Sequence, residues 1–133
     1  MNLYDVFSEI HNSISSLASD SFITVAKYLE LGTRFLYSSS ISYNRTSKGQ
    51  NKIIELGKVL NANTYINPIN GIKLYDKKEF KKNGIELFFL KMKEVHYSQF
   101  DKENFIPNLS IIDVLMFNPK EKIRQLINKY QLV

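Results

Sequence analysis

The amino-acid sequence predicts an α/β protein with a small, mostly parallel sheet flanked by helices. Residues 85–92 (IELFFLKM) form an apolar, aromatic-rich run that follows Gly84, as expected for a buried strand. Residues 33–67 read as strand, helix and strand, and strands joined in this way run parallel with a right-handed crossover. A chain of 133 residues without an internal repeat is expected to form one domain, residues 1–133.

Two helices are expected before residue 33. Apolar residues recur at spacings of three and four over residues 2–12 and again over residues 21–31, which is the period of an amphipathic helix. We expect Ser19 or Asp20 to cap the second helix and Gly32 to end it, because glycine readily adopts the left-handed conformation that follows many helices.

The strand–helix–strand unit begins with TRFLY, which we interpret as a short buried strand over residues 33–37. The helix over residues 47–61 presents isoleucine, leucine and valine side chains on one face. The second strand is TYIN, residues 64–67. A loop rich in turn-forming residues then spans residues 68–75.

The second half of the chain carries two helix-start signals. Asp76 is followed by Glu79 three residues later, as in a capping box. Asn118, followed by Pro119, is the expected cap of a final helix. The remaining expectations, in chain order, are a helix end at Gly84, the strand at residues 85–92, a loop at residues 96–106, an apolar helix at residues 110–117, and a final apolar stripe of Ile123, Leu126, Ile127 and Tyr130.

The most apolar run of the chain, NLSIIDVLMFN at residues 108–118, carries one acid, Asp113. A helix with this pattern has no polar face, so we expect it to be buried on nearly all sides, with Ser110 as its N-cap. A buried carboxylate must be paired or hydrogen-bonded. Two interpretations of Asp113 stay open: it accepts backbone N–H groups at the helix start, or it belongs to a functional site.

Composition excludes several functional classes. The chain has no cysteine, which excludes disulfides and thiolate chemistry and fits the reducing cytoplasm. No apolar run approaches the ~18 residues of a transmembrane helix. The net charge is +5, but only three of the 18 basic residues are arginine, so we expect no nucleic-acid partner. Four lysines, Lys77, Lys78, Lys81 and Lys82, are interpreted as a solvated helix face.

Polar residues follow both strands of the expected strand–helix–strand unit. In open parallel sheets, ligands bind beyond the carboxyl ends of the strands. Hydroxyls, N–H groups and cations near a helix N-terminus suit an anion, whereas ordinary turn chemistry explains the same residues without a ligand. These residues are Ser38, Ser39 and Ser40 after the first strand, Asn67, Asn70 and Gly71 after the second, and Arg45 and Lys48 before the helix.

No catalytic template is complete in this sequence. His11 and His96 have no metal-ligand spacing with each other or with another histidine, so we expect no metal site, and the sequence names no cofactor. A serine nucleophile would need an adjacent base, and none is indicated.

Three blocks of the chain resemble one family. FIPNLSIIDVLMFN at residues 105–118, the serines at residues 38–40 and the segment at residues 62–90 resemble the C-terminal half of the WbqC-like family of bacterial proteins. The resemblance covers about residues 33–133. Members of that family are longer, so the resemblance implies that this chain lacks an N-terminal half. It is then a truncated gene product, a remnant, or a stand-alone half that pairs with the missing half or with a second copy.

The resemblance also implies an activity. WbqC-like proteins are associated with surface-polysaccharide (O-antigen) gene clusters, which implies a transferase of glycyl or another aminoacyl group onto a sugar, with a nucleotide-sugar or an activated amino acid as ligand. The alternative is a non-enzymatic binding or assembly module, or a truncated half-protein, that docks a partner through an open sheet edge. We expect Ser38, Ser39, Asn67, Gly71 and Asn108 to bind the ligand, and Arg45 and Lys48 to balance phosphate charge. Asp113 is expected to act as the catalytic acid or base, or to orient a residue at the end of a strand.

Overall fold

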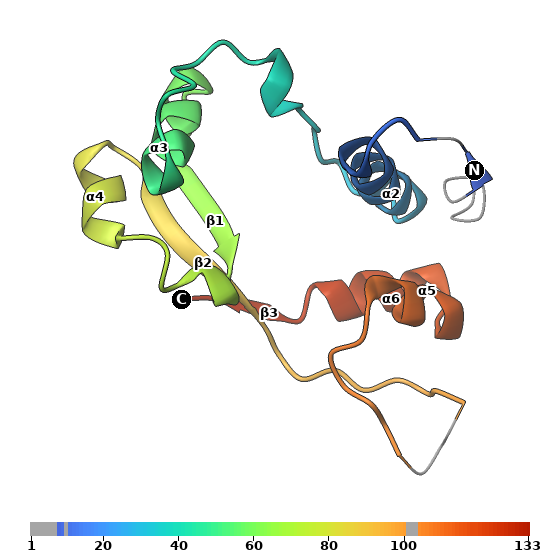
Figure 1. The fold of residues 1–133 in the computed structure, drawn as a ribbon. Coiled ribbons are helices and arrows are strands. Elements are labelled where there is room, and N and C mark those ends of the chain that lie inside the picture. Colours follow the sequence, from blue (N-terminus) through green and yellow to red (C-terminus); the bar gives the residue numbers. More distant parts are fainter. Residues whose placement is uncertain (1–7, 10, 101–103) are drawn as a thin grey trace. The chain divides into compact units, whose positions relative to one another are not determined.

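The computed structural model describes residues 8, 9, 11–100 and 104–133 (Figure 1). The chain divides into two compact units, which we describe separately. The first comprises Met1–Phe35 and Val95–Asn128, and the second comprises Leu36–Glu94 and Lys129–Val133. Helices and a sheet are both present, which confirms the α/β class. The single domain that we expected stays a prediction, and the helix expected over residues 2–12 lies largely outside the described residues.

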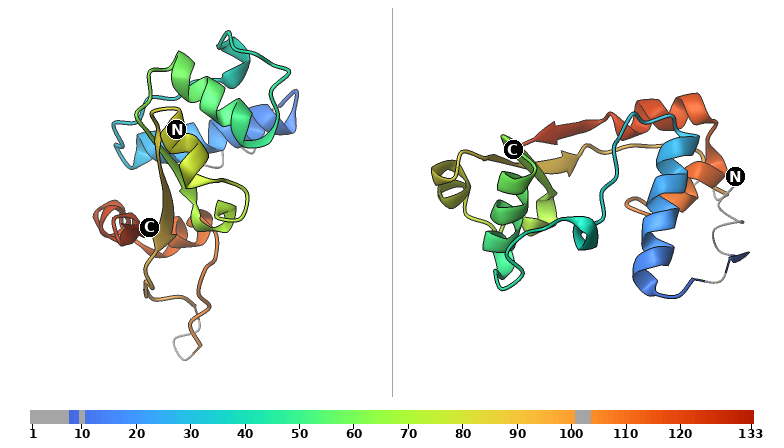
Figure 2. Two further views of the ribbon diagram at one scale, coloured as in Figure 1. Left: turned by 90° about the vertical axis from the view of Figure 1, so that its left-hand side faces the viewer. Right: turned by 90° about the horizontal axis from the view of Figure 1, so that it is seen from above.

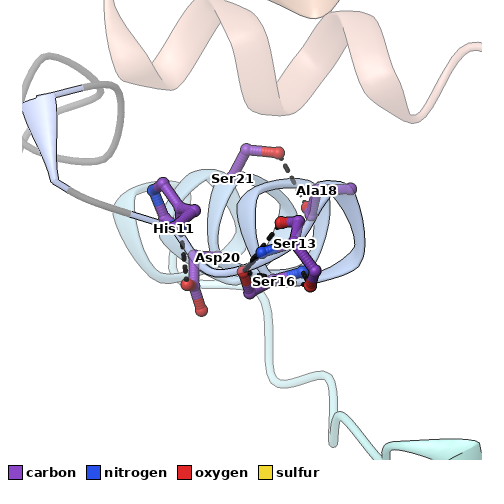
Figure 3. A network of polar contacts seen from close by, with 6 residues as sticks. All are labelled: His11, Ser13, Ser16, Ala18, Asp20 and Ser21. Atoms are coloured by element: carbon purple, nitrogen blue, oxygen red, sulfur yellow. Dashed lines mark hydrogen bonds and ion pairs between the residues drawn. The ribbon is translucent and has the colours of Figure 1, made fainter.

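The first helix of the first unit, α2 (Ile14–Tyr28), begins earlier than expected. Ser13 is its N-cap: the Ser13 hydroxyl accepts a hydrogen bond from the Ser16 N–H at 3.1 Å, and the Ser16 hydroxyl accepts one from the Ser13 N–H at 3.3 Å (Figure 3). The expected cap at Ser19 or Asp20 is therefore wrong. The serines at positions 13 and 16 instead satisfy the first N–H groups of a helix that begins before residue 19.

The C-terminal end of α2 also differs from the expectation. Leu29 is the C-cap, and Glu30 (φ 53°) adopts the left-handed conformation that we expected at Gly32. The Glu30 carboxylate lies 2.5 Å from Lys120 Nζ and 3.1 Å from Arg124 Nη1. The hydrogen bond from Lys120 is the main cause that lowers the pKa of Glu30. These ion pairs join the end of α2 to the third helix of this unit.

Helix α5 (Ile111–Phe117) forms where we expected it, and the Ser110 hydroxyl caps it by accepting a hydrogen bond from the Ile112 N–H at 3.2 Å. The expected burial on nearly all sides is wrong. No residue of α5 is fully buried, and Met116 is 72% exposed. Only helices α2 and α6 accompany α5 among the described residues of the first unit, and two helices cannot enclose a third on every side.

Helix α6 (Lys120–Ile127) starts after Pro119, one position later than expected. Asn118 does not cap α6, because its side-chain amide donates to a carbonyl in the last turn of α5. Ile123 and Leu126 are buried, which confirms this part of the predicted apolar stripe.

The second unit contains a sheet of three strands, β1 (Thr64–Pro68), β2 (Glu86–Met92) and β3 (Tyr130–Leu132), in the order β1-β2-β3 (Figure 1). Strand β1 pairs parallel with β2, and β2 pairs antiparallel with β3. The sheet is therefore mixed and not mostly parallel. Strand β3 was not predicted, because Tyr130 had been assigned to the final helix.

The strand expected at residues 33–37 is wrong. These residues have no regular secondary structure and are exposed, although β1 and β2 both form where the sequence predicted them. The strand–helix–strand unit is consequently shifted along the chain. It consists of β1, α4 (Lys77–Lys82) and β2, and its two strands are parallel.

Helices α3 (Gly49–Val59) and α4 accompany the sheet (Figure 2). Asp76 caps α4 as expected, since its carboxylate accepts the Lys78 N–H at 2.9 Å. Glu79 pairs with Lys82 at 3.2 Å rather than closing a capping box, and the four lysines of α4 are exposed as expected. The helices and the sheet share one buried cluster, which consists of Ile54, Phe80, Ile85, Leu87 and Phe89.

The opposite face of the sheet is also apolar. Leu87 and Phe89 point into the buried cluster, so the alternate residues of β2 face the other way. Ile66 pairs with Phe88, Leu132 with Leu90, and Tyr130 with Met92, so these side chains share that face. Four of them keep large exposed fractions: Ile66 47%, Met92 46%, Leu132 41% and Tyr130 40%.

Phe80 is the strongest single test of this core. Its side chain is completely buried, so Phe80→Ala should lower the free energy of unfolding by about 3–5 kcal/mol. Leu74 is 71% exposed, and Leu74→Ala should change that free energy by less than about 0.5 kcal/mol. Urea denaturation followed by circular dichroism measures both. Equal effects of the two substitutions would contradict the assigned core.

Candidate functional site

A turn around the predicted serines is held by one arginine. Ser38–Ser40 form a short 3₁₀ helix, η1. Nη2 of Arg45 donates to three backbone carbonyls, those of Ser39 at 3.0 Å, Ile41 at 3.3 Å and Ser38 at 3.5 Å. The structure therefore brings Ser38, Ser39 and Arg45 together, although the serines follow an irregular segment and not a strand. We call residues 38–45 the serine turn.

Hydrogen bonds between Asn44 and Thr46, the residues on either side of Arg45, turn the chain at this position. The Asn44 side chain accepts from the Thr46 N–H at 3.0 Å and from the Thr46 hydroxyl at 2.7 Å, which is the pattern of an Asx turn. Cζ of Arg45 lies 4.9 Å from the centre of the Tyr43 ring, and Nζ of Lys52 lies 6.0 Å from it. Because Lys52 belongs to the first turn of α3, Tyr43 connects the serine turn to that helix.

Lys48 stands at the start of α3. It is the N-cap residue, it is exposed, and its side chain makes no capping hydrogen bond. The first turn of α3 contains no acid. Lys48 and Lys52 therefore both lie at the N-terminus of α3, which is the positive end of the helix dipole. This arrangement favours a negatively charged group there.

The carboxyl end of β1 carries a second group of polar residues. The Asn67 amide donates to the Tyr65 hydroxyl at 2.8 Å. A Cβ atom at Gly71 would lie 2.1 Å from Oδ1 of Asn67, so only glycine allows the amide to occupy this position. The structure thus brings Asn67 and Gly71 together, and Asn67 is the predicted site residue that does lie at the end of a strand. We call Tyr65, Asn67, Gly71 and Tyr75 the tyrosine–amide cluster.

The two tyrosines of this cluster rest on the core. The ring of Tyr65 stacks on Phe80 at 5.5 Å, and Tyr75 meets both rings edge-on at 5.9 Å. Burial raises the pKa of Tyr65, the hydrogen bond from Asn67 opposes that shift, and a hydrogen bond with Tyr75 adds to it. Next to Tyr75, the Asp76 N–H donates to the Gln50 side chain at 2.9 Å, which links the cluster to the first turn of α3.

The first unit holds the two remaining predicted residues. Oδ2 of Asp113 accepts hydrogen bonds from the Tyr97 hydroxyl at 2.5 Å and from the Gln99 amide at 3.1 Å. The same Gln99 side chain pairs with the backbone of Ile106, at 2.9 and 3.1 Å. Asp113 therefore anchors the loop before α5 rather than capping the helix, a role that belongs to Ser110. Asn108 is exposed and has a left-handed backbone, with φ 60°.

The structure places six of the eight predicted site residues in the second unit and two in the first. Sequence reasoning missed Tyr43, Gln50 and Tyr65 and the roles of Tyr97 and Gln99. The period-two alternation of TYIN was the one available signal, since it puts Tyr65 and Asn67 on the same face of the strand.

Among the described residues, no group of three or more histidines or acids could hold a metal ion, and no helix is long and apolar enough to cross a membrane.

The hydroxyl of Tyr97 makes a pH-dependent contribution to stability. Desolvation by burial and, second, the hydrogen bond to Asp113 raise the pKa of Tyr97 above its ordinary value. A tyrosine whose pKa is higher in the folded chain than in the unfolded chain stabilises the fold below pH ~10, the ordinary tyrosine pKa. This stabilisation is lost as the pH rises through the folded-state pKa. The free energy of unfolding should therefore fall less steeply above pH 10 in Tyr97→Phe than in the native chain. Urea denaturation from pH 8 to 11.5 measures this, with Tyr37→Phe as the control at an exposed tyrosine.

A comparison with protein-family models matches residues 1–125 to the WbqC-like protein family. The match includes the first 32 residues, so our expectation that the resemblance begins near residue 33 and is confined to the C-terminal half is wrong. Comparisons with curated proteins and with solved structures gave no match. Because the family match spans nearly the whole chain, this protein belongs to the WbqC-like protein family.

Proposed function

We propose that this protein is a cytoplasmic transferase of bacterial surface-polysaccharide (O-antigen) biosynthesis, which moves an aminoacyl group such as glycyl onto a sugar. Membership of the WbqC-like family supports the biological setting. The observation that carries the chemistry is the convergence of two polar groups on the first turn of α3. Tyr43 reaches Lys52 from the serine turn, and Asp76 reaches Gln50 from beside the tyrosine–amide cluster.

The cations of this region suit the activated substrates of such a reaction. Nucleotide-sugars and activated amino acids carry phosphate groups. Lys48 and Lys52 lie at the positive end of α3, and the first turn of this helix contains no acid. We assign phosphate binding to Lys48 first, because it is the cap residue and is exposed.

The tyrosine–amide cluster supplies groups that recognise a sugar. Amide and hydroxyl groups exchange hydrogen bonds with sugar hydroxyls, and an aromatic ring beside them offers an apolar surface. Asn67 and Tyr75 are both half-buried, so a ligand can reach them. Tyr75 packs against the core, and a hydrogen bond to Tyr65 holds the Asn67 amide. Ser38 and Ser39 add two exposed hydroxyls.

Asp113 and Asn108 are kept as proposals in the first unit. Two donors hold Oδ2 of Asp113, which fixes the orientation of the carboxylate as an acid–base group requires. Asn108 precedes α5 with an exposed side chain that can contact a ligand.

Binding of a nucleotide-sugar tests this function. The native chain should show a thermal shift with UDP-N-acetylglucosamine, UDP or a non-hydrolysable glycyl-adenylate analogue. Lys48→Gln should weaken binding about tenfold, since a charge-assisted contact is worth roughly 1.5 kcal/mol or more. Gly71→Ala should also weaken it, because the added methyl group displaces the Asn67 amide. Lys58→Gln, an exposed lysine in the last turn of the same helix, is the matched control.

No shift with any of these compounds, or equal losses in Lys48→Gln and Lys58→Gln, would contradict the proposal.

The apolar sheet face favours a second candidate function, a module that docks a partner. Ile66, Met92, Tyr130 and Leu132 share this face and keep 40–47% of their surface exposed. Strands β1 and β3 also lie at the two ends of the sheet, so each has an unpaired edge in the strand order. A docking module should ignore the ligand panel and elute as a dimer or larger complex in sizing chromatography, and Leu132→Asp should shift that elution to the monomer position. A monomeric native chain would exclude self-docking.

A further inference from the structure

Arg45 lies in an unexpected environment. We expected it to balance phosphate charge, but Nη2 of its guanidinium lies 3.0–3.5 Å from the carbonyl oxygens of Ser38, Ser39 and Ile41. A positive charge close to three carbonyl oxygens is an arrangement that holds a backbone turn in one shape. These three contacts all engage Nη2 of the guanidinium.

The carbonyls at the end of η1 can accept hydrogen bonds from a nearby donor. A 3₁₀ helix leaves the carbonyls of its last residues without donors inside the helix, and cations near that end are favourable. In η1 the Ile41 N–H already donates to the Ser38 carbonyl at 3.3 Å. Arg45 adds a donor for Ser39 and Ile41, and it thereby fixes the end of η1 that Ser38 and Ser39 belong to.

The Tyr43 ring and the turn at Asn44 hold the Arg45 guanidinium in this position. Tyr43 lies under it, with Cζ 4.9 Å from the ring centre, and the Asx turn at Asn44 directs the chain back toward the serines. A guanidinium that swung out to a phosphate would give up the Tyr43 ring and all three carbonyls together, because one flat group makes both sets of contacts.

We propose that Arg45 is a positioning residue, which fixes the Ser38 and Ser39 hydroxyls for the ligand through the backbone of the serine turn, and that Lys48 supplies the positive charge that meets the ligand. This inference rests on the proposed function. The sequence analysis assigned the same role to both cations. Here Arg45 shapes the site, and Lys48 binds the ligand.

The experiment compares backbone order with affinity in the same variants. ¹⁵N relaxation gives order parameters for the amides of residues 38–41, and titration with UDP-N-acetylglucosamine gives the dissociation constant. Arg45→Gln should lower those order parameters and weaken binding about tenfold, because binding must then also order the serine turn. Lys48→Gln should weaken binding to a similar extent and leave the order parameters unchanged. Lys58→Gln should change neither.

A conservative variant adds a second readout. Lysine keeps the charge and has three N–H donors for the carbonyls, but it does not stack flat on Tyr43. Arg45→Lys should therefore restore part of the lost order and the same part of the lost affinity.

Two results would overturn the inference alone. In the first, Arg45→Gln weakens binding while the order parameters of residues 38–41 stay native, so that Arg45 contacts the ligand directly. In the second, Arg45→Gln loosens the turn while affinity stays native, so that the turn has no part in binding. A native chain that binds none of the three compounds overturns the proposed function and this inference with it.

Discussion

The second unit depends on the packing of Phe80 against β1 and β2. Phe80 comes from α4, is completely buried, and stacks on the Tyr65 ring of β1. This contact joins the helix of the β1-α4-β2 unit to the sheet. It also sets the geometry of the tyrosine–amide cluster, because the ring that rests on Phe80 carries the hydroxyl that Asn67 contacts. The Tyr65 side chain therefore belongs to both the core and the candidate site, and a displacement of Phe80 would reach the Asn67 amide through Tyr65.

The first turn of α3 links the two halves of the candidate site. Gln50 meets the segment after Tyr75, and Lys52 meets Tyr43 of the serine turn. Both residues follow Lys48 within one turn, so side chains on two different faces of a single helical turn fix two loops that are far apart in sequence. Regular structure thus positions residues that lie in irregular segments, which is the usual way in which rigid elements support functional loops.

The sequence predicted the elements whose signals are local. Strands β1 and β2, helices α3 and α4, and the Ser110 cap of α5 follow from alternation, periodicity and capping residues. The errors concern partners that no local pattern reveals. TRFLY has the composition of a strand but no neighbouring strand, and α5 has the composition of a buried helix but too few helices around it. For the site, Asn67 and Gly71 were predicted from their place after a strand, and Arg45 from its place before a helix. The aromatic residues that hold them follow from tertiary packing, which no local pattern reveals.

The antiparallel strand β3, which makes the sheet mixed, lies outside the residues that the family model matches. That match ends at residue 125, whereas β3 occupies Tyr130–Leu132. The matched part of the sheet is the parallel β1–β2 pair alone. In a two-stranded parallel pair both outer edges would be open, and Phe89 would lie at one of them. Val133 exchanges two backbone hydrogen bonds with Phe89, at 2.9 and 3.0 Å, so the residues after the match cover the edge next to the core strand. The residues matched by the family model thus include the parallel pair, with Asn67 on β1 and Gly71 in the short helix after it. Strand β3 covers the edge of this pair and supplies no residue of the candidate site.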